Sequence, residues 1–205
     1  MKTAFRRDEV EVVNKERVYD GYFKVDRYEF VHPLYAGGQS EILSREVFER
    51  GQVGAVLPYD PVTDQIVLIE QFRPGPYAAG SECWLLETVA GVLESGENPE
   101  QLVIREAEEE AGCKIQALEY VMRFFVSPGA STETVDLFCG KVNTIGIGGL
   151  HGLASEGEDI KVMVVDREEA WSMLGEGKFV NAKTIIALQW LQLNWQRMQK
   201  LWNEP

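Results

Sequence analysis

Residues 91–113 read Gly91-Val-Leu-Glu-Ser-Gly-Glu97-Asn-Pro-Glu-Gln-Leu-Val-Ile-Arg105-Glu106-Ala-Glu-Glu109-Glu110-Ala-Gly112-Cys113 and carry the strongest local signals in the chain. A helix is predicted from Pro99 to Ala111, because Asn98 is a good N-cap, proline suits the first turn and Gln101 occupies the capping-box position. Gly112 can end this helix. Its apolar residues recur at helical spacing and predict one buried face, formed by Val103, Ala107 and Ala111.

Three carboxylates gather on this predicted helix. Glu106, Glu109 and Glu110 stand at relative positions 0, 3 and 4, so they project from one face. At roughly 5 Å and an effective dielectric of about 20, each pair of such charges costs on the order of 3 kcal/mol. Hard divalent cations take oxygen ligands, and magnesium in particular bridges carboxylates to phosphates. The cluster therefore indicates a magnesium platform, with a solvated helix face as the alternative.

The same stretch resembles the Nudix box, whose pattern is Gly-x5-Glu-x7-Arg-Glu-U-x-Glu-Glu-x-Gly-U, where U is a bulky aliphatic residue. All seven fixed positions match, at Gly91, Glu97, Arg105, Glu106, Glu109, Glu110 and Gly112. The two U positions hold the smaller Ala107 and Cys113, a departure that affects packing and no charged group. The resemblance implies a Nudix fold and a metal-dependent attack of water on one phosphorus of a diphosphate joined to another group.

This resemblance also implies roles for the charged residues of the box. Glu106 and Glu110 would be the principal metal ligands. Glu109, Arg105 and Glu97 would act in catalysis. Glu109 would be a further metal ligand or a support for the ligands, and Arg105 would orient Glu97. The expected cofactor is Mg²⁺, with Mn²⁺ as the alternative.

Residues outside the box resemble one family, the bacterial ADP-ribose pyrophosphatases. Pro128 stands fifteen residues after Cys113, which is the mark of that family, although Ser-Pro-Gly is also an ordinary turn. The likeness covers nearly the whole chain, from Tyr19-Asp-Gly-Tyr-Phe through Glu70-Gln-Phe-Arg to the stretch that follows Asn181. It implies hydrolysis of ADP-ribose to AMP and ribose 5-phosphate.

The family likeness further implies how the substrate is held. Tyr22 would stack on adenine, Arg45 and Arg73 would hold polar groups of the ligand, and Pro128 would lie at the substrate. The N-terminal sheet would belong to a domain-swapped homodimer whose subunits share each pocket. Without the likeness, Tyr22 reads as a half-buried strand residue and the two arginines as structural residues.

A long stretch of loop composition runs from Asn143 to Asp159 and contains five glycines. The spacing of these glycines is not that of a phosphate-binding loop, so a mobile lid is the better interpretation. By resemblance, Glu156 would be the general base that acts on the attacking water. Glu158 and the carbonyl of Ala90 would complete the metal ligands. A merely solvated loop is the alternative.

Strands and helices alternate without a regular βαβ pattern, which favours an α+β fold with helices packed on both sides of a mixed sheet. Residues 1–50 are predicted to form an antiparallel β-sheet dimerisation subdomain, and residues 51–205 the Nudix hydrolase domain. In the second part, strands are predicted at Gln52 to Pro58, Gln65 to Gln71, Glu119 to Val126, Thr134 to Val142 and Ile160 to Val165, the first two pairing as a hairpin. Helices are predicted at Asp166 to Leu174 and after Asn181, the second packing through Ile186, Trp190 and Leu193.

Composition narrows the functional classes. A formal charge of −13 without a basic stripe argues against general nucleic-acid binding. No charge-free stretch is long enough to cross a membrane, and the first residues lack the pattern of a signal peptide, so the cytoplasm is the expected compartment. Three widely spaced cysteines, Cys83, Cys113 and Cys139, are predicted to be reduced core residues.

Two competing functions stay open from the sequence. GDP-mannose or another nucleoside diphosphate sugar could replace ADP-ribose, because the base preference of the pocket is not legible from one chain. A Nudix-like module could instead bind ADP-ribose as a sensor without cutting it. Such modules commonly lose box carboxylates, whereas all four glutamates of the box are present here.

Overall fold

A computed structural model describes residues 5–203 of the chain. It divides into two units, one of Met1–Gly51 with Phe125–Thr134 and one of Gln52–Phe124 with Val135–Pro205. The domain boundary predicted between residues 50 and 51, and the dimerisation role given to the first part, stay predictions.

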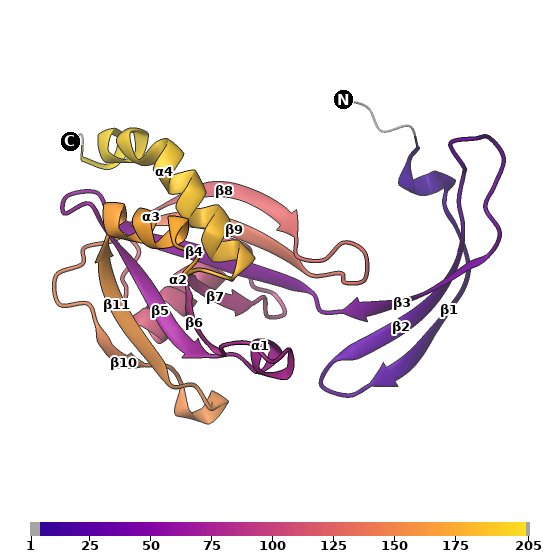
Figure 1. Ribbon diagram of the computed structural model, residues 1–205, viewed down its shortest axis with the longest axis horizontal. Coiled ribbons are helices and arrows are strands. Elements are labelled where there is room, and N and C mark those ends of the chain that lie inside the picture. Colours follow the sequence, from indigo (N-terminus) through magenta and orange to yellow (C-terminus); the bar gives the residue numbers. More distant parts are fainter. Residues whose placement is uncertain (1–4, 204–205) are drawn as a thin grey trace. The chain divides into compact units, whose positions relative to one another are not determined.

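The first unit contains an antiparallel sheet of β1 (Glu11–Asp20), β2 (Lys24–Val31) and β3 (Leu43–Glu49), preceded by the short 3-10 helix η1 (Arg7–Glu9) (Figure 1). The segment Phe125–Thr134 joins this unit at the end of β3. There the Phe48 N–H donates to the Ala130 carbonyl at 2.7 Å, and the Thr132 N–H donates to the Phe48 carbonyl at 3.0 Å. The small antiparallel sheet predicted from the sequence is confirmed.

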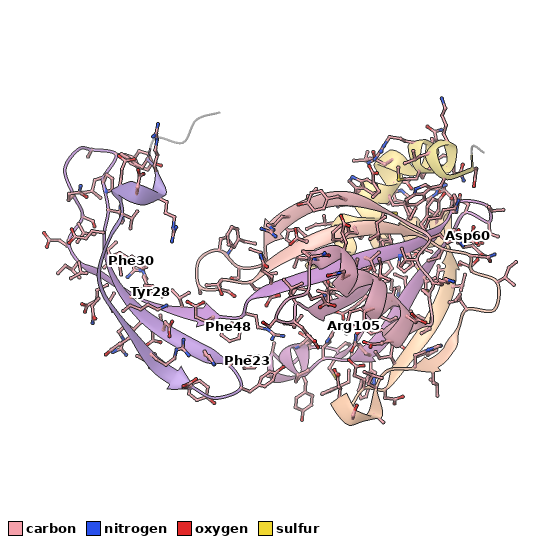
Figure 2. The ribbon with its side chains drawn as sticks, turned by 180° about the vertical axis from the view of Figure 1, so that it is seen from behind. Phe23, Tyr28, Phe30, Phe48, Asp60 and Arg105 are labelled. Carbon is pink, nitrogen blue, oxygen red and sulfur yellow. The ribbon has the colours of Figure 1, made fainter. Side chains whose placement is uncertain are left out.

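Charge and aromatic contacts stabilise this sheet. The buried carboxylate of Asp26 on β2 accepts contacts from two cations of β1, Arg17 and Lys15, the latter at 2.9 Å. A buried carboxylate needs such partners, because an unpaired charge away from water is costly. Tyr28 and Phe30 stack with ring centroids 5.2 Å apart, and both are labelled in Figure 2.

The second unit holds the remaining elements. Its strands are β4 (Gln52–Asp60), β5 (Gln65–Phe72), β6 (Trp84–Glu87), β7 (Val89–Val92), β8 (Ala117–Phe125), β9 (Thr134–Lys141), β10 (Gly149–His151) and β11 (Ile160–Asp166). Its helices are α1 (Pro74–Ala78), α2 (Pro99–Ala111), η2 (Ala154–Glu156), α3 (Arg167–Gly175) and α4 (Ala182–Asn203). Within residues 5–203, no helix has the length and apolar character needed to cross a membrane.

The strands of the second unit form one sheet in the order β10-β11-β5-β4-β9-β8, with β6 on β5 and β7 on β4. The predicted hairpin of β4 and β5 is present, with Tyr59 opposite Ile66. That hairpin is antiparallel, whereas β4 and β9 run in the same direction. At one end of these two strands the Thr134 N–H donates to the Gly51 carbonyl, and at the other end the Val142 N–H donates to the Tyr59 carbonyl. The sheet is therefore mixed.

Two apolar clusters cover the two faces of this sheet. On one face, Val103, Ala107 and Ala111 of α2 pack against Val67 and Ile69 of β5. On the other face, residues of α3 and α4 pack against alternate residues of the same strands. Figure 1 shows α3 and α4 on the near side of the sheet and α2 behind it. The predicted α+β fold, with a mixed sheet between helices, is confirmed.

The local signals around α2 are also confirmed. The Asn98 side chain accepts a hydrogen bond from the Gln101 N–H at 2.9 Å, and the Asn98 N–H donates to Oε1 of Gln101 at 3.1 Å, which completes the capping box. The helix ends at Gly112, whose φ of 61° lies in the left-handed region. The three cysteines are free and buried, as predicted.

Three expectations need correction. The stretch from Asn143 to Asp159 is not continuous loop, because β10 pairs with β11 and η2 follows it. On α4, Leu193 is 85% exposed, since it lies about 200° around the helix from the buried Leu191. The structure also contains α1, β6 and β7, for which no element was predicted.

Candidate active site

The site begins where α2 lies close to β4 and β7. A Cβ atom on Gly54 of β4 would approach Leu102 of α2 to 2.8 Å, and one on Gly91 of β7 would stand 1.9 Å from Oε1 of Glu106. Real Cβ atoms essentially never come this close to other atoms, so a larger residue at either position would force side chains of α2 to shift. The first fixed glycine of the box therefore leaves the space that the Glu106 carboxylate fills.

Arg105 is the centre of the charge network on α2, and Figure 2 labels it on this helix. Its Nε donates to Oε1 of Glu97 at 3.1 Å, and one terminal nitrogen donates to Oε2 of Glu109 at 2.8 Å. The same nitrogen stands 3.0 Å from Oε1 of Glu106. The hydrogen bond from Arg105 is the main cause that lowers the pKa of Glu97. One cation thus holds three carboxylates of the box, including the Arg105–Glu97 pair expected from the resemblance.

Glu110 is the most deeply buried carboxylate of the face, with 3% of its surface exposed. Its Oε2 accepts the N–H of Ala90, at 3.1 Å. Burial raises the pKa of Glu110 to about 8, and the charges of Glu106 and Glu158 raise it further, while the Ala90 hydrogen bond and the charge of Arg73 act in the opposite direction. The pKa of Glu106 is raised as well, first by burial. These two carboxylates resist ionising together in the absence of a cation.

The stretch that precedes β11 supplies two more acids. Glu158 accepts the N–H of Leu153 at 3.1 Å, and its charge raises the pKa values of Glu106 and Glu110. Glu158 is therefore electrostatically coupled to the face of α2. Glu156 is the exposed last residue of η2. Glu106, Glu110 and Glu158 thus form one acidic group, whereas Glu156 lies at the surface.

Arg73 stands at the end of β5, where it is the N-cap residue of α1. Its guanidinium contacts Oε2 of the buried Glu87 at 2.8 Å through Nε and at 2.6 Å through a terminal nitrogen. The other oxygen of Glu87 accepts from the Asn181 amide and stands 4.0 Å from Nζ of Lys183. Sequence reasoning missed Glu87; the available signal was a carboxylate inside the apolar run that precedes the box.

The donor set suits a hard divalent cation. The carboxylates of Glu106, Glu110 and Glu158 offer only oxygen atoms, and their mutual repulsion is the cost that a bound cation would relieve. Within residues 5–203, however, no three acidic, histidine or cysteine side chains already converge on one point in a metal-binding arrangement. Each carboxylate has another partner, namely Arg105, the Ala90 N–H and the Leu153 N–H. The residues fit the ion, and their carboxylate oxygens would have to come closer together to bind it.

Three predicted substrate-binding residues belong to the first unit. Tyr22 lies in the turn between β1 and β2 and is 86% exposed, so its alternative reading as a half-buried strand residue is wrong. Arg45 is an exposed residue of β3 whose guanidinium donates to the Ser44 carbonyl at 2.7 Å. Pro128 is exposed in the segment Phe125–Thr134. Their roles at the substrate stay predictions.

Comparisons with known proteins show which sequences and folds this chain resembles. The model of the NUDIX domain family matches residues 49–188. The ADP-ribose pyrophosphatase of Escherichia coli (strain K12) is 44% identical over 202 residues, which cover 98% of this chain and 97% of the relative. The ADP-ribose pyrophosphatase of Haemophilus influenzae is 43% identical, covering 97% and 93%. The GDP-mannose pyrophosphatase of Yersinia enterocolitica is 30% identical, covering 90% and 96%.

A solved structure described as an ADP compounds hydrolase matches with a TM-score of 0.70 and 18% identity, covering 93% of this chain and 96% of its own. At that identity the match supports the fold alone. The family match spans the whole box, and the likeness to ADP-ribose pyrophosphatases indicated by the sequence is confirmed over nearly the full length. The chain belongs to the NUDIX domain family.

Proposed function

We infer that this chain hydrolyses the diphosphate bond of ADP-ribose, giving AMP and ribose 5-phosphate. The observation that carries the inference is the set of four box glutamates around α2: Arg105 holds Glu97, from the turn before the helix, and Glu109, while Glu110 is buried beside Ala90. The choice of substrate is supported by relatives named ADP-ribose pyrophosphatase, which are 43–44% identical over nearly the whole chain. In the reaction, water forms a bond to one phosphorus and the bond from that phosphorus to the bridging oxygen breaks.

The proposed cofactor is Mg²⁺, with Mn²⁺ as the alternative, held by the carboxylates of Glu106, Glu110 and Glu158 together with the carbonyl of Ala90. When bound, such a cation polarises the phosphoryl oxygens and offsets the charge that develops on the leaving phosphate. Magnesium is the better candidate because it prefers carboxylate and phosphate oxygens together.

The side chains of the protein supply the remaining steps. Glu156 takes the proton of the attacking water, and its place on the stretch before β11 would allow that stretch to close over the substrate. Arg105 fixes the orientation of Glu97 and Glu109. Arg73 holds a polar group of the ligand, with Tyr22, Arg45 and Pro128 as the further substrate contacts that the family likeness implies.

A second substrate is supported by one observation. Relatives named GDP-mannose pyrophosphatase are 30–37% identical over most of this chain. Their lower identity ranks GDP-mannose below ADP-ribose. The sensor function is disfavoured, because all four box glutamates and their arginine are present, whereas sensor modules commonly lose box carboxylates.

The function is tested by a panel of ADP-ribose, GDP-mannose, UDP-glucose, NADH and dATP with Mg²⁺, the products being separated by ion-exchange chromatography. We expect the highest kcat/KM for ADP-ribose, with AMP and ribose 5-phosphate in equal amounts. Faster cleavage of another nucleotide would keep the reaction and replace the substrate. Tight binding of ADP-ribose without cleavage would support the sensor.

The metal-ligand assignment is tested by Glu110→Gln, with Glu108→Gln as the matched control on the exposed side of the same helix. Loss of one ligand charge should lower kcat/KM by about 10²-fold or more, as expected when a group that stabilises transition-state charge is removed. The control should keep its activity within about twofold, the scatter expected of an exposed charge. Near-normal turnover of the Glu110→Gln protein would contradict the assignment.

The same variant has a second readout in the metal-free protein. Because the folded pKa of Glu110 is raised from 4.5 to about 8, its contribution to stability is present below pH 4.5 and is lost as the pH rises through about 8. Glutamine does not ionise and escapes this loss. Above pH 8, metal-free Glu110→Gln protein should therefore unfold at a higher temperature than the unmodified protein, whereas a lower temperature would mean that the change damages the fold.

The proposed general base is tested by Glu156→Gln, compared with Asp159→Asn, an exposed acid of the same stretch. Removal of the proton acceptor should lower kcat by about 10² to 10⁴-fold and leave KM within a fewfold of its starting value. The aspartate variant should change neither constant appreciably. If only KM rises in Glu156→Gln, the side chain binds substrate and the base lies elsewhere.

We also propose that the first unit forms a domain-swapped homodimer. The proposal is supported by the family likeness and by several large apolar side chains that β1 exposes, among them Val12, Val13 and Tyr19. Val12→Glu should therefore shift the protein towards monomer in sedimentation equilibrium, because a charge would enter the interface. Val62→Glu, at an exposed valine of the second unit, is the control. A monomeric unmodified protein, or equal behaviour of the two variants, would contradict the proposal.

A further inference from the structure

Gln71 carries a buried amide without a partner. It is 7% exposed, and its Nε2 is one of two buried side-chain polar atoms within residues 5–203 that make no hydrogen bond, the other being Oγ1 of Thr134. A buried donor left unpaired costs about 1–3 kcal/mol, so native proteins retain few of them. The unpaired amide of Gln71 is therefore available to donate a hydrogen bond to an acceptor atom of a bound ligand.

The side chain of Gln71 belongs to the α2 face of the sheet. Successive side chains of a strand point to opposite faces, and Val67 and Ile69 of β5 pack in the apolar cluster that includes α2. Gln71 is the next residue of that series. Glu70, on the opposite face, instead pairs with Lys161 of β11.

The neighbours of Gln71 place it beside the acidic group. On β6, Gln71 is paired with Leu85. Leu85 precedes Glu87 by two residues, and the Glu87 carboxylate accepts a hydrogen bond from Arg73. On the other side of β5, Glu70 is paired with Lys161 of the antiparallel β11, so Ile160 lies next to Gln71. Ile160 follows Glu158 by two residues. Arg73 itself lies close enough to Glu110 to lower the pKa of that carboxyl. The unpaired amide thus lies at the end of β5 between the arginine and the acids.

We propose that Gln71 is a substrate-binding residue whose amide donates a hydrogen bond to a non-bridging phosphate oxygen of the bound diphosphate. The proposal rests on the proposed function. An N–H donor cannot ligate a cation, so the partner must be an acceptor, and the diphosphate is the ligand group richest in acceptors. A neutral donor also adds a contact to the phosphate without adding positive charge that would repel the cation.

The test uses Gln71→Met, which keeps the length of the side chain and removes both amide donors. Binding of α,β-methylene-ADP-ribose, in which a methylene group replaces the bridging oxygen and prevents cleavage, is measured by calorimetry with Mg²⁺ present. We expect about tenfold weaker binding, the effect of one hydrogen bond to a charged acceptor. The same loss is expected for α,β-methylene-ADP, which lacks the distal ribose. A loss confined to the ADP-ribose analogue would place the amide at the distal sugar and overturn the phosphate assignment.

Thermal unfolding of the ligand-free variant separates this role from a structural one. Removal of an unpaired donor should leave the melting temperature unchanged or raise it. A clear decrease would mean that the amide has a buried structural partner, which would overturn the proposal. Thr134→Val, at the other unpaired buried polar atom, is the matched control and should keep the affinity for the analogue.

The binding measurements separate a failure of the proposed function from a failure of the role proposed for Gln71. If the unmodified protein neither binds the analogue nor cleaves ADP-ribose, the proposed function is wrong. If the unmodified protein binds the analogue and Gln71→Met binds it equally well, the function stands and Gln71 makes no contact with the diphosphate.

Discussion

The contact of one guanidinium with three carboxylates is the interaction on which the site depends. Glu97 reaches Arg105 from the turn before α2, whereas Glu106 and Glu109 reach it from the helix itself. Without this cation, the carboxylates would repel each other at distances where each pair costs on the order of 3 kcal/mol. Arg105 therefore allows a short helix to present several acids on one face, and it fixes the turn before the helix at the same time.

Close packing of α2 on the sheet is the second constraint, and it serves stability and chemistry together. Gly54 and Gly91 let the helix approach two strands, which buries Val103 and Ala107 in the apolar cluster. The same approach buries Glu110 and seats the Glu106 carboxylate against the backbone of β7. A looser helix would leave these carboxylates in water, where their pKa values would return towards the ordinary range.

Features encoded by neighbouring residues could be predicted from the sequence, and features that depend on distant strands could not. The caps and the buried stripe of α2 follow from residues within one helix, and the charge pattern of the box follows from their spacing. Glu87 and β10 were missed because the partner of each, Arg73 or β11, is supplied by the tertiary fold. Leu193 was misassigned for the same reason, because spacing alone does not say which side of a helix meets the sheet. Gln71 gives no local signal, since its lack of a partner is a property of its surroundings.

The balance of charge explains why an acidic protein would need a cation to bind an anionic substrate. Arg105 is already paired with Glu97, Glu106 and Glu109, and Arg73 is paired with the buried Glu87. These arginines therefore give the site little net positive charge, while Glu110 and Glu158 add negative charge when they ionise. A diphosphate approaching this face would be repelled by the chain alone. A divalent cation reverses the local sign, and neutral donors such as an amide can then orient the phosphate without competing with the metal. On this argument, metal dependence follows from how the cations of the protein are already used.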